Sequence, residues 1–379
     1  MKFLQVMSFY RGYQDAFYAA RPGLAERPFD EQIAELLKDG FSATHHFAPA
    51  MRALGYEPYF VVGDCRRAQE AWARRNGMTE ERPSLNDIVI GQINALRPDV
   101  LLISDPTALD PRILRRCDWR PQLVAAWRAA PIPDGADWSN VDLFLSSHTG
   151  CQAEALRLGA RHAEQFRPGF PAWIAEAVIG EEKSIDVLFS GHVGPLHKRR
   201  LDCLLALCRA PEAREGRWNI QLLLQGDTAS LPAEMTSFVG PGVWGMEMYR
   251  ATKRSRIVLN VHIDMAGGES QNMRMYETTG VGTFLLTDHG DNVGTMFEPG
   301  VELATFGDPE DMVAAIRHFL AAADEREAIA RRGQERCLRQ HGIAARAADL
   351  DQLIRARLDV VRSFSDARWC THSSGQGKL

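Results

Sequence analysis

The most constraining feature of this 379-residue chain is an alternation of strand-like and helix-like segments that begins twice. The first series of apolar, strand-like runs lies at residues 3–7, 57–62, 98–104, 122–126 and 141–145, with helical patterns between them. The second series lies at residues 185–190, 219–224, 257–261, 283–287 and 302–306. Strands joined by helices form parallel sheets with helices on both faces. The sequence therefore predicts an α/β protein with two Rossmann-like, doubly wound domains.

The chain length and the second start of the pattern suggest where the domains divide. We expect a first domain over residues 1–170 and a second over 171–343, because a chain of this length usually forms two domains. The apolar pattern of residues 344–362 predicts a C-terminal helix. Residues 363–379 end in small and polar residues, which predicts a flexible tail. The apolar stripe of the predicted helix consists of Leu350, Leu353, Ile354 and Leu358.

Charge and cysteine content exclude several classes of protein. The net charge of −5 and the pI near 6.1 give no electrostatic reason to expect a nucleic-acid partner. No run approaches the roughly 18 apolar residues of a spanning helix, and the apolar start meets Arg11 too soon for a signal peptide. Seven cysteines without a C-x-x-C pair favour reduced thiols over disulfides or zinc. We expect a cytoplasmic protein without a transmembrane segment; contact with the inner face of a membrane stays open, as does a homodimer.

Two glutamates, Glu269 and Glu277, lie eight residues apart between two strand-like runs. A helix that begins near Gln271 would direct its first backbone N–H groups and its positive dipole end toward the preceding loop, which suits a phosphate. Glu269 would lie in that loop. Glu277 would lie about two turns into the helix, where a carboxylate can accept hydrogen bonds from a sugar diol.

Glycines and basic residues follow the first strand of the second domain. Gly191 lies where open α/β sheets bind ligands, and Lys198 and Arg199 begin the next helix, where they can bind a phosphate. The spacing is not G-x-G-x-x-G, so a dinucleotide-binding motif is absent there. Further on, the loop with Val239 and Gly240 precedes a helix containing Tyr249, and its backbone could contact a nucleobase.

These residues together resemble the C-terminal domain of GT-B glycosyltransferases of the family-4-like, retaining group. The closer similarity is to the CgeB-like subset of the group 1 glycosyltransferases, whose patterns are N-x-R-x-x-E and G-x-x-L-L-T-D. Here they stand at residues 272–277 and 282–288. Residues 296–300 and 329–336 also match, and the resemblance covers about residues 185–341. It implies a GT-B architecture, in which the last helix packs back on the N-terminal, acceptor-binding domain.

The resemblance also implies a role for each donor-site residue. Glu277 would bind the ribose hydroxyls, Glu269 the donor sugar, and Val239 with Gly240 the base. The diphosphate would be neutralised by basic side chains and the glycine loop. The resulting donor-site residues are Gly191, Lys198, Arg199, Val239, Gly240, Tyr249, Asn272, Met273, Arg274 and Glu277. No D-x-D motif stands in a fitting position, so neither a metal nor another cofactor is implied.

The sequence departs from the family pattern at two places. Residues 270–272 read Ser-Gln-Asn where family-4-like enzymes often have Gly-Phe-Gly. Trp127 and Arg128 stand where those enzymes commonly have a histidine that contacts the sugar. Details of sugar binding, and any inference of a retaining mechanism, therefore stay open.

The first domain would bind the acceptor in an enzyme of this architecture. An aromatic-rich loop at residues 9–18 follows the first strand and could stack on an acceptor. Together with Glu269, the candidate catalytic residues are Asp105, His148 and His45; Asp105 and His148 lie just past strand ends. An inverting mechanism needs one of them as a base, whereas a retaining one can use the leaving phosphate.

We expect a metal-independent glycosyltransferase that moves a sugar from a nucleotide-diphosphate sugar, such as a UDP- or GDP-sugar, to an acceptor hydroxyl. Glycan, lipid-linked, protein and small-molecule acceptors all stay open. One alternative is a sugar-nucleotide epimerase or hydrolase of the same fold, which would need no acceptor. Another is a catalytically degenerate nucleotide-binding module.

Overall fold

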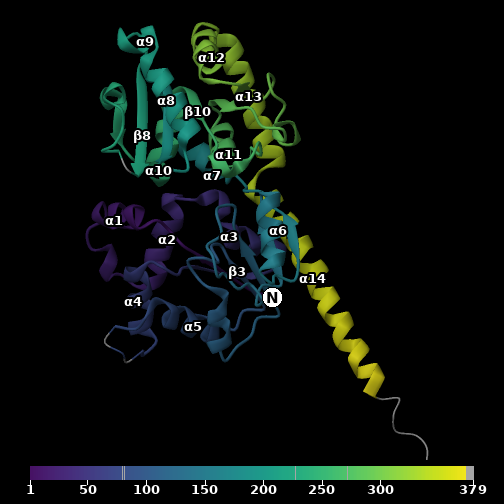
Figure 1. The fold of residues 1–379 in the computed structure, drawn as a ribbon. Helices are drawn as coiled ribbons and strands as arrows, with labels where there is room; N and C mark the ends of the chain where they lie inside the picture. The colour runs from purple at the N-terminus through teal and green to yellow at the C-terminus, as the bar shows by residue number, and fades with distance from the viewer. Residues whose placement is uncertain (79, 81, 227, 271, 373–379) are drawn as a thin grey trace, which may run out of the picture. The chain divides into compact units, whose positions relative to one another are not determined.

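The structure is a computed structural model, and it describes residues 1–372 apart from residues 79, 81, 227 and 271. The chain forms two compact units (Figure 1). Unit 1 consists of Met1–Glu35, His46–Phe166 and the chain from Arg346 onward, and unit 2 consists of Leu36–His45 and Arg167–Ala345. Each unit contains one six-stranded parallel sheet, as the sequence predicts.

The sheet of unit 1 has the strand order β2-β1-β3-β4-β5-β6. Its strands are β1 (Lys2–Met7), β2 (Glu57–Val62), β3 (Val100–Ile103), β4 (Leu123–Trp127), β5 (Leu143–Ser146) and β6 (Ala163–Gln165). The helices of this part of the chain are α1 (Arg11–Ala19), α2 (Phe29–Asp39), α3 (Phe47–Met51), α4 (Arg66–Arg75), α5 (Leu85–Leu96) and α6 (Thr149–Arg157). Strands β1, β3, β4 and β5 are almost entirely buried because helices cover both faces of a parallel sheet.

The sheet of unit 2 has the strand order β12-β11-β10-β7-β8-β9. Its strands are β7 (Ile185–Val193), β8 (Ile220–Gly226), β9 (Val239–Pro241), β10 (Ser255–Asn260), β11 (Phe284–Asp288) and β12 (Ala304–Phe306). Its helices are α7 (Ala172–Ala177), α8 (Lys198–Arg209), α9 (Pro211–Arg214), α10 (Gly245–Arg254), α11 (Met273–Gly280), α12 (Pro309–Ala321) and α13 (Ala323–Gln340). The chain runs from β7 outward to β9 and then returns to β10 on the other side of β7. The strand order therefore reverses between β7 and β10.

Alternate residues of the β7 and β10 strands enter different core clusters. Val187 and Ile257 belong to the large cluster that also contains side chains of α8 and α12. Leu188 and Val258 belong to a small cluster with Ala251 of α10. Since successive side chains of a strand point to opposite faces, this division shows that both faces of the sheet are buried.

Residues Leu36–His45 pack within unit 2, although they lie in the range 1–170 assigned to the first domain from the sequence. Phe41 makes an edge-to-face contact with Trp244, with ring centroids 5.4 Å apart. Ala43 enters the unit 2 core, and Thr44 O accepts a hydrogen bond from Gly169 N at 2.8 Å. The burial of these apolar side chains against distant parts of the sequence decides the assignment, which no local pattern reveals.

Helix α14 (Ile343–His372) belongs to unit 1 from Arg346 onward. Three side chains of the predicted stripe, Leu350, Ile354 and Leu358, are buried there. Tyr56 OH donates a hydrogen bond to Asp351 at 2.7 Å. The helix continues past residue 362, where the predicted tail begins, and residues 373–379 of that tail lie outside the described residues.

The aromatic-rich segment after β1 forms helix α1 and not the expected loop. Tyr13, Phe17 and Tyr18 are buried, whereas Tyr10 is 68% exposed. Aromatic residues three to four positions apart form one face of a helix, and here that face is buried in unit 1. Most of these rings therefore stabilise the unit and are not presented to a ligand.

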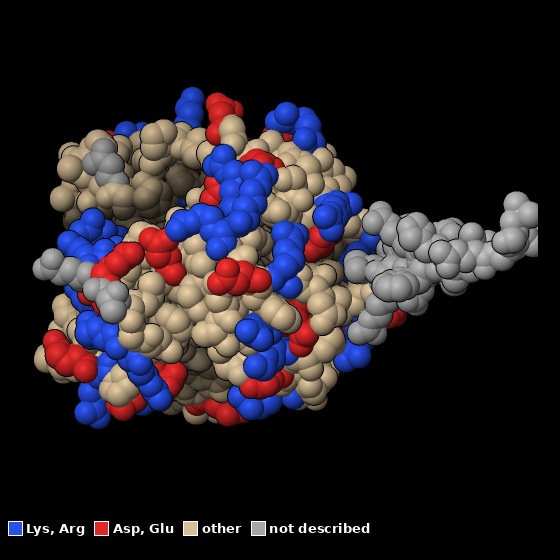
Figure 2. All heavy atoms as spheres, turned by 90° about the horizontal axis from the view of Figure 1, so that it is seen from below, with Lys and Arg blue, Asp and Glu red and all other residues tan. Residues whose placement is uncertain are grey.

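Charges of both signs are mixed on the surface shown in Figure 2. Lysines and arginines lie among aspartates and glutamates there, and no large area carries a single sign. Within the described part of the chain, no helix is both long and apolar enough to cross a membrane.

Candidate functional site

The candidate site lies in unit 2, where the strand order reverses at the carboxyl ends of β7 and β10. Ligands of open α/β sheets bind at such a point. Val258 pairs with Leu188, and the same register two residues further brings Asn260 level with Ser190. The side chains that follow these two strand ends therefore meet at one edge of the sheet.

Helix α11 begins directly beside the end of β10. Asn272 is its N-cap residue, but the Asn272 side chain makes no capping hydrogen bond. Instead, Asn272 Nδ2 donates to Asn260 Oδ1 at 2.8 Å, and Asn260 Nδ2 donates to Asn272 Oδ1 at 3.2 Å and to Thr287 Oγ1 at 3.0 Å. Gln271, where the sequence predicted the start of the helix, lies outside the described residues. The N-terminus of α11 is thus fixed to the sheet without a side-chain cap, which suits an anion.

Glu277 is buried in α11 and has a partner on each carboxylate oxygen. Arg274 Nη1 lies 3.0 Å from Oε2, and Tyr249 OH donates to Oε1 at 3.3 Å. Arg274 Nη2 also donates to Ser190 O at 3.0 Å, so this guanidinium joins β7 to the glutamate. A carboxylate has about four acceptor positions. Glu277 can therefore still accept hydrogen bonds from a ligand.

Tyr249 is fully buried, and its predicted contact with a ligand stays a prediction. Burial, followed by the charge of Glu277, raises the pKa of Tyr249 well above its usual value. The phenol therefore stays protonated and donates to the carboxylate. Its role in the structure is to position Glu277.

Two glycines shape the loop that carries Glu269. Gly268 has a φ of 93°, a conformation that favours glycine. A Cβ atom on Gly290, in the loop after β11, would lie 2.1 Å from Ser270 Oγ. Ser270 N donates to Asn292 Oδ1 at 2.7 Å, which joins the two loops. Glu269 is thereby held, half-buried, three residues before the α11 N-cap.

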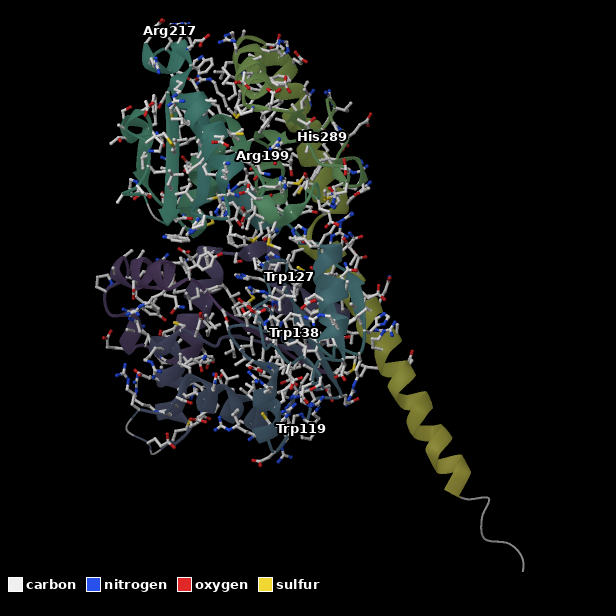
Figure 3. All side chains as sticks on the ribbon, in the orientation of Figure 1. Trp119, Trp127, Trp138, Arg199, Arg217 and His289 are labelled. Carbon is white, nitrogen blue, oxygen red and sulfur yellow. The ribbon has the colours of Figure 1, made fainter. Side chains whose placement is uncertain are left out.

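The basic residues of α8 differ in what they contact. Asp264 caps this helix, because its carboxylate accepts from Lys198 N at 2.7 Å and Arg199 N at 3.3 Å. The Lys198 side chain is exposed, and no described residue pairs with its ammonium group. Arg199, labelled in Figure 3, donates to Gly307 O at 2.6 Å and lies 3.9 Å from Asp288. Lys198 therefore offers its charge to a ligand more readily than Arg199 does.

Arg200 is buried and joins the ends of the two central strands. Its guanidinium donates to Val261 O at 3.1 and 2.7 Å and to His192 O. Burial lowers the pKa of Arg200 to about 10, so it remains charged at neutral pH. This residue fixes the backbone on both sides of the point where the strand order reverses, a role that no sequence pattern predicted.

Three buried polar atoms at this edge have no hydrogen-bond partner among the described residues. They are Ser190 Oγ in β7, His197 Nδ1 in the β7–α8 loop and His262 Nε2 just after β10. Burial, with a smaller effect from Arg200, lowers the pKa of His197 to about 4, so this imidazole is neutral. Buried polar groups are normally hydrogen-bonded. The three atoms lie in or just after the adjacent strands β7 and β10, where a polar ligand would supply the missing hydrogen-bond partners.

Gly191 and the predicted base-contacting residues lie along the same sheet. Gly191 is within β7 and pairs with Leu224 of β8. Val239 and Gly240 are in the edge strand β9, two strands from β7. At about 4.8 Å per strand, β9 ends roughly 10 Å from β7. That separation suits the length of a nucleoside whose phosphates lie at β7.

Met273 is the first residue of α11, and its sulfur accepts a weak contact from Ser42 Oγ, 3.8 Å away.

The candidate bases belong to different units. Asp105 follows β3 in unit 1 and is paired with Arg128 Nη1 at 2.8 Å. His148 is the N-cap residue of α6, after β5, and thus two strands from Asp105. His45 belongs to unit 2, and burial lowers its pKa to about 3, which makes it a weak base. The structure therefore does not single out any of the three residues as the catalytic base.

Asp64, which the sequence did not single out, follows β2 in unit 1. Both of its carboxylate oxygens accept from Phe9 N at 3.1 Å. Burial raises the pKa of Asp64 to about 6, the backbone hydrogen bonds oppose this, and the charge of Asp105 adds to it. The sequence places Asp64 directly after a strand, which could have marked it as a site residue, but many aspartates follow strands.

Comparisons with known proteins find a family model that matches part of unit 2 and the start of α14. Residues 213–352 match the family model described as glycosyl transferase-like. None of the curated protein sequences matches this chain.

Similar solved structures cover nearly the whole chain. The Anabaena protein HepE in complex with UDP-glucose has a TM-score of 0.60 at 10% identity, over 94% of this chain and 100% of that one. Sucrose-phosphate synthase from Thermosynechococcus elongatus has a TM-score of 0.55 at 11% identity, over 95% and 100%. AviGT4, a glycosyltransferase involved in avilamycin A biosynthesis, has a TM-score of 0.56 at 15% identity, over 95% and 98%. The fold of this chain is that of these proteins.

Proposed function

Since the chain has the GT-B glycosyltransferase fold and a glycosyl transferase-like segment over residues 213–352, we propose that it transfers a sugar from a nucleotide-diphosphate sugar to an acceptor hydroxyl. The observation that carries the proposal is the group of unpartnered, buried polar atoms where the strand order of unit 2 reverses. The uncapped N-terminus of α11 and the charge of Lys198 lie at the same edge of the sheet. UDP is the proposed nucleotide, because HepE was solved with UDP-glucose.

In the proposed reaction, the bond between the sugar C1 and the diphosphate oxygen breaks, and the electron pair stays on the diphosphate. A bond forms between C1 and the acceptor oxygen, whose proton passes to a base. Preorganised positive charge lowers the barrier by stabilising the leaving diphosphate. Lys198, Arg274 and the α11 N-terminus would supply that charge, so we propose that no divalent cation is required.

The roles of the two glutamates follow from their positions. Glu277, fixed by Arg274 and Tyr249, would accept hydrogen bonds from the ribose hydroxyls. Glu269, in the loop before α11, would contact the donor sugar. For the acceptor, we propose a hydroxyl of a glycan or glycoconjugate that binds at the carboxyl edge of the unit 1 sheet, where Asp64 would be the preferred base.

Thermal-shift measurements with UDP, GDP, dTDP, ADP and CDP test the proposal. One nucleotide should raise the Tm of the wild type, and binding at 100 times Kd should stabilise the folded state by about 2.7 kcal/mol. Glu277→Gln keeps the side-chain volume and one acceptor oxygen, and it should lose most of that shift. Glu335→Ala, which removes an exposed glutamate from α13, should keep it. One series of samples contains EDTA and a second contains Mg²⁺ without EDTA, and a shift seen only in the second series would contradict metal independence.

Other outcomes separate the remaining functions. Hydrolysis of the UDP-sugar at the same rate with and without acceptors would favour a hydrolase. If no nucleotide at millimolar concentration changes the Tm of the wild type, the proposed donor site is wrong.

A further inference from the structure

We propose that His262, oriented by Asp288, binds the diphosphate of the nucleotide as an imidazolium whose Nε2–H donates to a phosphate oxygen. The inference rests on the proposed function, because it concerns the same nucleotide. It adds a catalytic residue that neither the two glutamates nor the basic residues of α8 suggest.

The contact between the two side chains is short and buried. Asp288 is the last residue of β11, and His262 comes two residues after the end of the neighbouring strand β10. His262 Nδ1 lies 2.6 Å from Asp288 Oδ1, and His262 N donates to Oδ1 at 3.1 Å and Oδ2 at 3.3 Å. The exposed fractions of the two residues are both 6%. One carboxylate therefore holds both the backbone and the ring of His262.

This contact determines which ring nitrogen is left for a ligand. Burial alone would raise the pKa of Asp288, but the hydrogen bond and charge of His262 outweigh burial and lower it. The ionised carboxylate accepts a hydrogen bond from Nδ1–H, which leaves Nε2 as the ring nitrogen that can contact a ligand. Nε2 is buried and has no partner among the described residues. A buried polar atom without a partner is unfavourable, so packing alone does not account for it.

The surroundings of His262 suit a phosphate. Asn260, two residues earlier, is bonded to Asn272 at the start of α11. Two residues of extended chain span about 7 Å, which keeps His262 close to the uncapped N-terminus of that helix. The positive helix end and an imidazolium would face the same anion.

The charged groups around the pair come from three elements. Asp288 lies on β11, Arg199 and Arg200 lie on α8, and Asp264 lies in the loop after His262. The two arginines bring positive charge to this end of the sheet, which favours a diphosphate there.

The chemistry needs no additional reactant. As the C1–O bond breaks, negative charge grows on the departing phosphate oxygen. The Nε2–H group strengthens its hydrogen bond to that oxygen and keeps its proton. A charge-assisted hydrogen bond of this kind contributes about 1.5–3 kcal/mol, which corresponds to roughly 10- to 150-fold in affinity.

The test compares UDP and uridine binding to the wild type and His262→Asn by calorimetry between pH 7 and pH 9. Asparagine can still donate to Asp288 in place of Nδ1–H, but it has nothing in place of Nε2. The last ionisation of a terminal phosphate has a pKa near 6, so UDP is almost fully ionised above about pH 7 and that range reports on the protein. The wild-type affinity for UDP should fall as the pH rises, because the imidazolium that the phosphate favours is lost.

We expect His262→Asn to bind UDP about 10- to 150-fold more weakly, without that pH dependence, and to bind uridine as the wild type does. His318→Asn, which changes an exposed histidine on α12, should behave as the wild type. Asp288→Asn should keep the fold and shift the UDP profile to lower pH, since a neutral amide favours the imidazolium less. This variant tests the proposal even if His262→Asn fails to fold.

Equal UDP affinity and an equal pH profile in the wild type and His262→Asn would overturn the inference and leave the proposed function intact. An equal loss of UDP and uridine binding would also overturn it, because it would indicate a structural role. If the wild type binds no nucleotide at all, the proposed function itself is wrong.

Discussion

At the scale of single residues, the structure supplies the partners that give the motif residues their chemistry. Glu277 was found from its spacing to Glu269, but its two partners, Arg274 and Tyr249, are contacts of the folded chain. Arg274 is three residues away on the same helix, a spacing at which helical side chains meet. Tyr249 comes from α10 and could not be paired with Glu277 from the sequence.

A residue-scale prediction concerns Asp64. Because burial raises its pKa to about 6 from an unfolded value near 3.8, the folded state binds this proton more tightly. The proton on Asp64 therefore stabilises the folded state fully below about pH 4. This contribution to the free energy of unfolding is lost as the pH rises through about 6. Asp64→Asn should therefore stabilise the protein relative to wild type by about 1–2 kcal/mol at pH 7.5, and not at pH 4.

Thermal denaturation at the two pH values measures this difference. Asp30→Asn, at an exposed position in α2, should show no such dependence. If Asp64 is the base, the stabilised variant should also lose most of its kcat. An identical change in Tm at both pH values would show that Asp64 does not titrate as proposed.

At the scale of elements, the position of Glu269 depends on two loops that meet. The loop before α11 and the loop after β11 touch at Ser270 and Gly290, where there is no space for a side chain. The sequence predicted the glycine-containing loop before α11. It did not indicate that the loop after β11 would contact the loop before α11. Ser270 and Gly290 are 20 positions apart, and they meet only after β10 and β11 have paired.

Gly290→Ala tests that contact. The added methyl group would displace Ser270, so we expect a loss of about 1–3 kcal/mol in stability and weaker binding of UDP-glucose. UDP binding should change less, because the ribose and phosphate contacts lie on α11 and the strand ends. Gly294→Ala is the matched control, since a Cβ at that position meets nothing within 4 Å. Equal binding of UDP-glucose by both variants would argue against a role of this loop in holding the sugar.

At the scale of the whole molecule, two segments belong to a unit that their sequence position does not suggest. Leu36–His45 pack in unit 2, and α14 from Arg346 onward packs in unit 1. The apolar stripe predicted the buried face of α14, and the resemblance implied its return to the first domain. No sequence pattern in residues 36–45 predicted that they would pack in unit 2.

The C-terminal helix should be needed for the stability of unit 1. Ile354 is fully buried, and Ile354→Ala should cost about 2–5 kcal/mol through lost burial and the cavity left behind. Gln352→Ala, on the exposed side of α14, should cost little. Denaturation followed by hydrogen exchange would locate the loss in unit 1, while amides of the unit 2 sheet stay protected. An unchanged Tm for Ile354→Ala would contradict the burial of this helix.

The sequence by itself determined the alternation of strands and helices, the two parallel sheets and the segment that contains Glu269 and Glu277. These properties follow from local periodicity and from residues close together in the chain. The tertiary structure alone decided the strand order, the pairing of His262 with Asp288, the buried Tyr249 and the placement of residues 36–45. The physical reason is that these features depend on which strands become neighbours, and strand neighbours are set by packing between segments far apart in the sequence.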